Sequence, residues 1–497
     1  MWDLELDRSC NTPLQLQIFQ HYFQAITCGE YVAGDMLPSI REQARKLQIA
    51  RITVVLAYEK LITSGYISSR PGIGYQVVFK HPVKKILQKP NYFKGPDPIE
   101  LIAADVPGDL YNQSTAELYC RIGIPDPNAF PWSSWRKWNN APSHLKEQLV
   151  TRYHSPQGLL SLRLEIVRYL RFARGIHTRV ENIIITNGVQ EGLSLLTQLF
   201  VINQHALNNA PCHIVSESPC YSGAWHLFNY YQAKITPVAV DQRGMRVADL
   251  PECSTQLCYV TPSHQYPLGS RLSLARRKSL LRWALRVGAY VIEDDYDAVF
   301  SREEQPLPAL KAMDSHDRVI HAGTFSKTLG PGIRLGFLVC PDAIIESVIN
   351  MKALSNSGSN WLLQQFLAEF MQNQVFYTHL SKLGCEYEAR QHVLHKGLQR
   401  LFPEGKIWGH MAGLHLTLIT PLGGEFVQQL QQACLRQGVR FDTLHELENG
   451  SETAWRNSCC QSVIFFGFGG LNLQQLNKVL IFIEQQLENL KLNGVAK

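Results

Sequence analysis

The most informative stretch of this chain is Thr324-Phe-Ser-Lys327-Thr-Leu-Gly-Pro-Gly-Ile-Arg334-Leu-Gly336. In it, a lysine stands among hydroxyl groups, glycines and an arginine. The amine of Lys327 suits covalent bonding to an aldehyde, whereas Thr324, Ser326 and Arg334 suit a phosphate group. The stretch therefore predicts a site for an aldehyde cofactor that carries a phosphate, namely pyridoxal phosphate. The alternative for the lysine alone is an ordinary surface charge.

Around this stretch, short apolar runs alternate with longer amphipathic segments from residue 119 to the end. The runs are Ile183 to Ile185, His213 to Ser216, Leu257 to Thr261, Tyr290 to Asp294, Val319 to Ala322, and Leu335 to Cys340. Repeats of strand, helix and strand build a mainly parallel sheet with helices on both faces, so the predicted class is α/β. Ligands bind such sheets at the carboxyl ends of the strands, which is where the polar candidates fall.

A glycine-containing turn, Thr186-Asn-Gly188-Val189-Gln190-Glu-Gly192, follows the first apolar run and leads into a helix. Free backbone N–H groups and the helix dipole at such a helix start can hold a phosphate. Gly188, Val189 and Gln190 are therefore candidates for the cofactor phosphate. An ordinary connection between a strand and a helix has the same pattern.

Three further side chains are candidates to hold the cofactor ring. Asp294 and Tyr296 are two apart at a strand end and so share a face. The carboxylate suits a protonated pyridine nitrogen, and the phenol suits the ring oxygen. Tyr221 is placed to stack on the ring, or else to be a core aromatic. The alternatives for the acidic cluster are a solvated strand end or a divalent metal site from Asp294, Asp295 and Asp297.

The first 80 residues have a different pattern. Apolar residues repeat every fourth position, as the buried face of a first helix would, at Leu14, Ile18, Tyr22 and Ile26. Ser39, followed three residues later by Glu42, predicts the capping box of a second short helix. A third helix is expected from about Ala50 to Ser64, and two short extended runs around Gly72 predict a hairpin. This arrangement is a winged helix-turn-helix, whose third helix enters the major groove of DNA.

This segment resembles the GntR family of DNA-binding domains over about 70 residues. The resemblance lies in Pro38-Ser-Ile-Arg41-Glu, in Arg51-Ile-Thr53-Val-Val-Leu-Ala-Tyr-Glu-Lys-Leu and in Gly65-Tyr-Ile-Ser-Ser-Arg-Pro-Gly72-Ile-Gly74. It implies contacts to double-stranded operator DNA from Arg41, Arg51, Thr53 and Gly74. Ala50 and Ile52 depart from the family pattern, which would change operator preference and leave phosphate attraction intact.

Charge and composition are consistent with a DNA-binding segment joined to a larger body. Residues 1–94 hold twelve Lys and Arg against seven Asp and Glu, whereas the rest of the 497 residues is nearly balanced. A basic segment suits a polyanion, although a solvated basic face is the alternative. No apolar run is long enough to span a bilayer, and no leader pattern opens the chain, so a cytoplasmic protein is expected. We predict a DNA-binding domain at residues 1–80, a proline-containing linker at 81–118 and a cofactor domain at 119–497.

The cofactor domain resembles the type I fold of pyridoxal-phosphate aminotransferases across nearly all of residues 119–497. More narrowly, four segments resemble the MocR subfamily of GntR regulators: Arg121-Ile-Gly-Ile-Pro-Asp-Pro127, Tyr153-His-Ser-Pro-Gln-Gly158, Thr261-Pro-Ser-His-Gln-Tyr266-Pro and Glu293-Asp-Asp-Tyr-Asp297. The resemblance implies a smaller C-terminal α+β subdomain and a head-to-tail homodimer. In that dimer, Tyr153 would reach the phosphate in the partner subunit's site.

One departure argues against enzymatic turnover. Aminotransferases usually carry a late arginine that docks the substrate carboxylate, yet the strand expected from Ser462 to Gly470 contains none. Arg440 and Arg456 are the only arginines from residue 440 onward, and neither has the familiar context. Tyr266 stands where an asparagine is common in the family.

The sequence therefore predicts a MocR-type transcriptional regulator that binds pyridoxal phosphate through Lys327. Occupancy of that site by a B6 vitamer, or its reaction with an amine or amino-acid effector, would change DNA binding. The alternatives are an active aminotransferase with an accessory DNA-binding module, and a cofactor-free regulator on a former aminotransferase scaffold.

Overall fold

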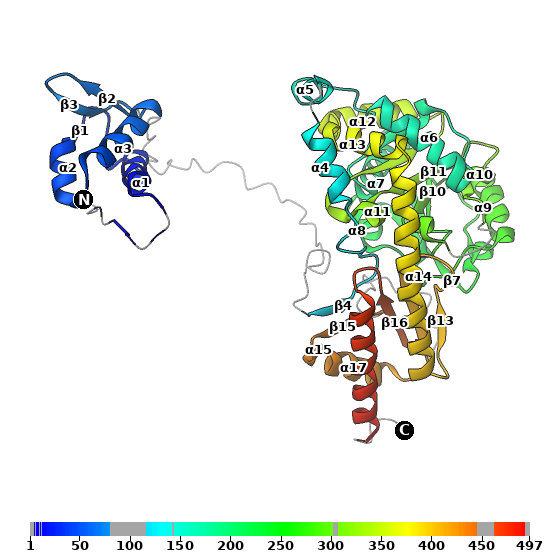
Figure 1. Ribbon diagram of the computed structural model, residues 1–497. Helices are drawn as coiled ribbons and strands as arrows, with labels where there is room; N and C mark the ends of the chain where they lie inside the picture. The colour runs from blue at the N-terminus through cyan, green and yellow to red at the C-terminus, as the bar shows by residue number, and fades with distance from the viewer. Residues whose placement is uncertain are drawn as a thin grey trace, which may run out of the picture. The chain divides into compact units, whose positions relative to one another are not determined.

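In the computed structural model of the chain, two compact units are present, residues 1–103 and residues 104–497 (Figure 1). We call them the N-terminal unit and the C-terminal unit. The structure describes residues 12–79, 116–141, 144–301, 307–444 and 462–492, together with Leu4, Leu6, Asp7, Arg8 and Cys10. The predicted linker lies outside the described residues except for its last positions, so its boundaries stay a prediction.

The N-terminal unit contains the three helices and the hairpin that the sequence predicts. Its elements are α1 Leu14–Thr27, β1 Met36–Leu37, α2 Ile40–Leu47, α3 Arg51–Thr63, β2 Ile67–Arg70 and β3 Gly74–Val77. Ser39 caps α2, because its Oγ accepts a hydrogen bond from the backbone N–H of Glu42 at 3.2 Å. The strands pair antiparallel in the order β1-β3-β2. The predicted winged helix-turn-helix fold is thereby confirmed.

One small core holds the N-terminal unit together. Helix α1 contributes Ile18, Tyr22 and Ile26, and α3 contributes Tyr58 and Leu61, all of them buried. The hydroxyl of Tyr58 donates to the carbonyl of Pro38 at 3.0 Å, which fixes α3 against the turn before α2. The apolar faces are therefore turned inward, and the opposite face of α3 is left to solvent.

The C-terminal unit is built on an eight-stranded sheet in the order β5-β12-β11-β10-β9-β6-β7-β8. The strands are β5 Ile183–Thr186, β6 His213–Ser218, β7 Lys234–Asp241, β8 Gly244–Met245, β9 Leu257–Val260, β10 Tyr290–Asp295, β11 Val319–Thr324 and β12 Gly336–Val339. All six predicted runs are strands of this sheet, and β7 and β8 were not predicted. Only β12 and β8 run opposite to the other strands of this sheet. The predicted α/β class with a mainly parallel sheet is therefore confirmed.

Helices cover both faces of this sheet, and alternate strand residues face each layer. One face packs against α7 Val189–Asn208, α8 Ser222–Tyr230 and α12 Ile345–Asn356. The other face packs against α6 Leu160–Arg174, α9 Leu274–Val287 and α13 Trp361–Gln372. Neighbouring residues of β5 show the alternation, because Ile184 lies in the first layer and Ile185 in the second. Each such fully buried aliphatic side chain contributes about 1.5–3 kcal/mol.

The further α-helices of the C-terminal unit lie among the strands of this sheet and around a second, smaller sheet. They are α4 Trp132–Asn140, α5 His144–Thr151, α10 Leu310–Met313, α11 Ser326–Leu329, the long α14 Val375–Leu401, α15 Gly424–Arg436 and α17 Leu473–Leu492. Figure 1 shows α14 running from the large sheet down to the smaller subdomain, where α17 lies beside it and α15 lies beside α17. None of the helices in the described part of the chain is both long and apolar enough to cross a bilayer.

The smaller sheet has the order β13-β14-β16-β15-β4. Its strands are β13 Lys406–Trp408, β14 His415–Thr420, β15 Val439–Thr443, β16 Ser462–Gly467 and β4 Leu118–Cys120. Strand β4, from the start of the C-terminal unit, pairs parallel with β15, and Tyr119 lies beside Arg440. This pairing brings the segment around residue 120 to the edge of the large sheet, where the candidate site lies.

Candidate functional site

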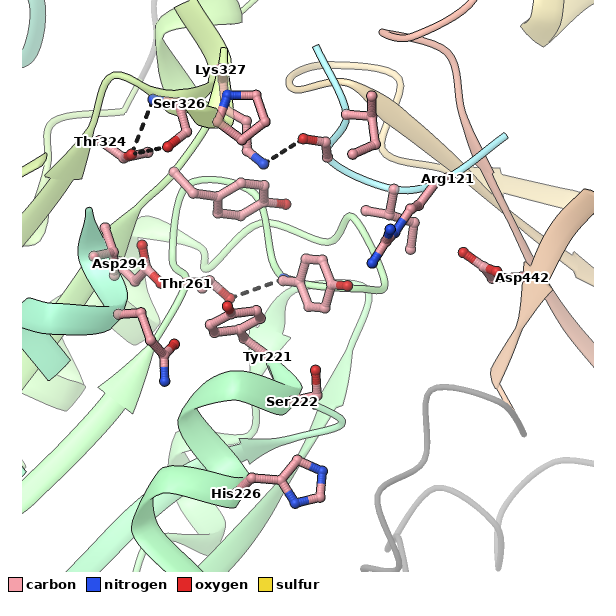
Figure 2. Close-up of a pocket in the computed structure, with 18 of the residues that line it drawn as sticks. Arg121, Tyr221, Ser222, His226, Thr261, Asp294, Thr324, Ser326, Lys327 and Asp442 are labelled. Atoms are coloured by element: carbon pink, nitrogen blue, oxygen red, sulfur yellow. Dashed lines mark hydrogen bonds between the residues drawn. The ribbon is translucent and has the colours of Figure 1, made fainter. Parts of the chain in front are cut away.

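A cavity of about 490 Å³ lies at the carboxyl ends of β6, β9, β10 and β11 in the C-terminal unit (Figure 2). Predicted site residues that line it are Val189, Gln190, Tyr221, Asp294, Tyr296, Thr324, Ser326, Lys327 and Arg334. These positions span some 145 residues of sequence, and the sheet brings them together because its parallel strands end on this side, where the antiparallel β12 begins. The volume is ordinary for a small-molecule site.

Lys327 projects into the cavity from α11, which begins directly after β11. Its amine donates a hydrogen bond to the carbonyl of Gly123, in the segment that follows β4. Removal from water lowers the pKa of Lys327, because burial disfavours the charged ammonium. A larger share of the amine is therefore neutral and nucleophilic than for a lysine in water.

Asp294 is the next-to-last residue of β10, on the same side of the sheet. Its Oδ2 accepts a hydrogen bond from the hydroxyl of Tyr259 at 2.7 Å, and its Oδ1 has no partner among the described residues. Burial raises the pKa of Asp294 to about 6. A buried carboxylate with one unpaired oxygen is well suited to a cationic ring nitrogen, which would supply both a hydrogen bond and the opposite charge.

At another part of the cavity, the residues form a lining suited to a phosphate. Gly188 precedes α7 with a φ of 87°, a backbone conformation that favours glycine, and a Cβ there would lie 3.0 Å from Nη2 of Arg334. Arg334 also donates to the carbonyl of Asn187 at 2.5 Å. Thr324 Oγ1 donates to Ser326 Oγ at 3.0 Å, which holds the two hydroxyls side by side. A helix N-terminus, a guanidinium and two hydroxyls are groups that bind phosphate.

Two tyrosines complete the region predicted for the ring. The rings of Tyr221 and Tyr266 meet edge to face with centroids 5.8 Å apart, so Tyr221 is held at the cavity wall. The hydroxyl of Tyr296 lies 3.1 Å from Nδ1 of His264. Both predicted ring partners thus lie in the cavity, and Tyr266, noted as a departure from the family pattern, lines it too.

The residues that line the cavity fit pyridoxal phosphate. The cavity combines an amine, an unpaired buried carboxylate oxygen and a phosphate-type lining. The three carboxylates of the alternative metal site do not meet at one place, because two of them take separate partners. Asp295 pairs with Arg174 at 2.6 Å, and Asp297 pairs with His264 at 2.9 Å, whereas Asp294 faces the cavity.

Some cavity residues were missed from the sequence. They are Tyr119, Arg121, Gly123, Ser222, His226, Tyr259, Thr261 and Asp442, as well as Arg440, which the sequence interpretation set aside for its unfamiliar context. The alternation Arg440-Phe-Asp442 along a strand was a signal that could have placed both charges on one face. Tyr153 does not line the cavity and is 93% exposed, so its predicted role in a partner's site is untested.

The candidate DNA contacts lie on the surface of the N-terminal unit. Arg41 and Arg51 are exposed, and Arg51 is the first residue of α3. Thr53 follows in the first turn and is half-buried. Gly74 has a φ of 120° at the start of β3, a conformation that favours glycine in the tight hairpin. These positions place two cations at the N-terminal ends of the second and third helices.

The fold and the cavity define a protein with a helix-turn-helix DNA-binding domain and an aminotransferase-like domain. Two family models match: "Bacterial regulatory proteins, gntR family" at residues 14–77 and "Aminotransferase class I and II" at residues 124–446. A kynurenine aminotransferase of Pyrococcus horikoshii, solved with PMP and its substrates, superposes with a TM-score of 0.66 at 23% identity. It covers 78% of this chain and 97% of its own, and shows the shared fold.

Two relatives that match most of the chain are named as regulators. The probable rhizopine catabolism regulatory protein MocR of Rhizobium meliloti is 31% identical over 393 residues, which is 78% of either chain. The pyridoxine biosynthesis transcriptional regulator PdxR of Corynebacterium glutamicum is 29% identical over 478 residues, covering 94% of this chain and 95% of its own. The chain belongs to the MocR-type subfamily of GntR transcriptional regulators and contains an aminotransferase class I and II domain.

Proposed function

We propose that this regulator binds pyridoxal phosphate in the cavity around Lys327 and that the state of this site changes its affinity for operator DNA. The observation that carries the proposal is a nucleophilic lysine in one cavity with an unpaired buried carboxylate oxygen and a phosphate-type lining, on a chain that also has a winged helix. A lysine with only a structural role would not need the unpaired carboxylate oxygen and the phosphate-type lining around it.

Each part of the cavity has a separate task in the proposal. When bound, the cofactor supplies an aldehyde that reacts with amines and a ring that withdraws electrons. Lys327 provides the amine that anchors it. Asp294 holds a proton on the ring nitrogen, and Tyr221 covers the ring. Gly188, Val189, Gln190, Thr324, Ser326 and Arg334 hold the phosphate.

The DNA-binding part of the proposal rests on the N-terminal unit. Arg41 and Arg51, each in the first turn of its helix, would contact phosphates or base edges of double-stranded DNA, with Thr53 and the hairpin at Gly74 beside them. We propose a head-to-tail homodimer in which the exposed Tyr153 reaches the partner's phosphate site. A dimer can also adopt two arrangements of its subunits. If the ligand binds one arrangement more tightly than the other, ligand binding and DNA binding become coupled.

The effector is either a B6 vitamer itself or an amine or amino acid that reacts at the loaded site. A relative named for regulation of pyridoxine biosynthesis supports the vitamer. The alternative function, an active aminotransferase with an accessory DNA-binding module, is supported by the same cavity. It would be favoured by turnover between an amino acid and a keto acid at about 1 per second or faster.

The test is operator affinity with and without the vitamer, measured by fluorescence anisotropy on the full chain. We expect wild-type affinity to change about five-fold or more upon loading, the usual size of an allosteric coupling. Lys327→Ala should show no change, whereas Lys278→Ala, an exposed lysine on α9 of the same unit, should behave as wild type. Equal affinities for loaded and unloaded wild-type protein would refute the coupling.

A further inference from the structure

One wall of the cavity is made by the smaller sheet and has not been assigned a role. Strands β4 and β15 pair in parallel, with Tyr119 beside Arg440 and Cys120 beside Phe441. If this register is extended by one residue past the end of β4, Arg121 lies beside Asp442. Side chains two apart on a strand point to the same face. Accordingly, all four of these polar residues line the cavity: Tyr119, Arg121, Arg440 and Asp442.

Contacts within this wall hold Asp442 and Arg440 in place. The hydroxyl of Tyr119 donates to Oδ1 of Asp442 at 2.8 Å, and Nε of Arg440 lies 3.9 Å from the same oxygen. The guanidinium of Arg440 also stacks on the ring of Tyr119, 4.9 Å from its centroid. The wall therefore contains two guanidinium groups and one carboxylate, an excess of one positive charge.

This wall lies away from the phosphate lining. Figure 2 shows Thr324 and Ser326 on one side of Lys327, and Arg121 with Asp442 on the other. A cofactor that is anchored at Lys327 and has its phosphate at Thr324 and Ser326 leaves the opposite wall for a second molecule. That molecule would have its amine beside Lys327 and its other end at Arg121.

The neighbouring strand β16 has an apolar residue beside this wall. Phe465 of β16 pairs directly with Asp442, so the two side chains are on the same face of the sheet. Phe465 is fully buried and packs with Ile122 and Tyr266. The apolar ring of Phe465, on β16, thus lies beside the carboxylate of Asp442, on β15. Strand β16 is the one where aminotransferases would be expected to carry the arginine. The cations of this wall come instead from the two neighbouring segments.

We infer that Arg121 and Arg440 form the recognition site for the anionic group of the effector, and that the effector is an amine that also carries a carboxylate. This inference rests on the proposed function and deepens it. A planar guanidinium matches a carboxylate in a bidentate pair, which a bare amine or an alkyl group cannot form. Asp442 sets the strength of the site, because its charge opposes a second carboxylate while it holds Arg440 and Tyr119.

The test compares ligands that differ only in the carboxylate. Full-length, cofactor-loaded protein is titrated by calorimetry with unbranched amino carboxylates of increasing length, and with the alkylamine of the same length for each. We expect wild-type protein to bind the best amino carboxylate about ten-fold or more tightly than its amine, as for a hydrogen-bonded charge pair. Free vitamer is titrated as a third ligand, to measure whether this wall binds a phosphate group as well as a carboxylate.

Three variants separate the inference from a structural role. Arg121→Gln should reduce the preference for the carboxylate to nearly none. Asp442→Asn should raise it, because the opposing charge is gone while the amide oxygen still accepts from Tyr119. The exposed Lys278→Ala serves as the unchanged control. A loss of fold in either wall variant would lower the affinity for amine and carboxylate together and so cannot produce these opposite changes in their ratio.

The outcomes are distinguishable from those of the proposed function. Loaded wild-type protein without any preference for the carboxylate would overturn the inference and leave the proposed function standing. A preference that survives in Arg121→Gln and is unchanged in Asp442→Asn would also overturn it. Protein that never takes up the vitamer would overturn both.

Discussion

Charged side chains are arranged differently in the two units, and the difference separates what each unit can do. Among residues 12–79, Gln43 is the one buried polar side chain, and the arginines of α2 and α3 are exposed. The described part of the C-terminal unit instead buries Glu217, Glu293, Arg277 and Lys352. Exposed charge acts on any polyanion and is screened by salt. Buried charge acts only through a particular partner, which suits a site that must recognise one ligand.

The largest predicted effect comes from removing one member of a buried pair. Nζ of Lys352 on α12 lies 2.6 Å from Oε1 of Glu191, whose other oxygen accepts from the backbone N–H of Asn187 beside the phosphate lining. Lys352→Met should lower the free energy of unfolding by about 3–5 kcal/mol, because the Glu191 carboxylate, which is only 15% exposed, loses its cationic partner. Denaturant unfolding of the cofactor-free protein measures this.

The matched control is the double variant Lys352→Met with Glu191→Gln. It leaves no unpaired charge and should recover most of the lost stability. A single Lys352→Met variant that unfolds within about 1 kcal/mol of wild type would show that this unit does not depend on paired interior charge, and the contrast between the units would fail.

A second prediction has the opposite sign. Burial raises the pKa of Asp294 from its ordinary value of 3.8 to about 6. The folded protein therefore holds this proton more tightly than the unfolded chain, and stability is lost as the pH rises from about 4 to about 6. Asp294→Asn should stabilise the cofactor-free protein at pH 7 by on the order of 3 kcal/mol.

The same substitution should weaken cofactor binding, because an amide cannot supply the negative charge that a protonated ring nitrogen needs. Thermal unfolding at pH 4 and pH 7 in parallel with vitamer titration measures both effects. Equal stability of the variant and wild type at both values of pH, or undiminished cofactor affinity, would remove Asp294 from its proposed place.

The smallest predicted effect is in the N-terminal unit. Arg51→Ala should weaken operator binding by about 1–3 kcal/mol and reduce the salt dependence of binding by about one phosphate contact if the guanidinium contacts a phosphate. Stability should be nearly unchanged, since Arg51 is exposed. Lys60→Ala, at the C-terminal end of the same helix, is the matched control. Equal affinity of Arg51→Ala and wild type across several salt concentrations would contradict the assignment.

The features that the sequence predicted correctly were those formed by neighbouring residues. Ser39 and Glu42 lie three positions apart, so a helix cap was readable. The Ile-rich run at β5 is short, apolar and followed by a glycine turn, so a buried strand was readable. Strand β7 was missed, because Lys234 and Pro237 interrupt its apolar pattern and several of its residues are only half-buried.

The features that could not be predicted were made by distant residues. Tyr119 and Asp442 share a hydrogen bond although they are 323 positions apart, and only the parallel pairing of β4 with β15 brings them together. The partners of Asp295 and Asp297 were equally unreadable, since Arg174 and His264 come from other elements. The order of the strands along the chain was enough to predict that the cofactor candidates lie in one cavity. Parallel strands end at one edge of a sheet whatever their spacing in the sequence.

Mass spectrometry can detect the proposed covalent bond between a B6 vitamer and Lys327. Full-length protein is incubated with pyridoxal phosphate, reduced with borohydride and digested. We expect the mass of one reduced cofactor on the peptide that contains Phe325-Ser-Lys327-Thr328, and no added mass in Lys327→Ala. Wild-type protein whose Lys327 peptide gains no mass would contradict it.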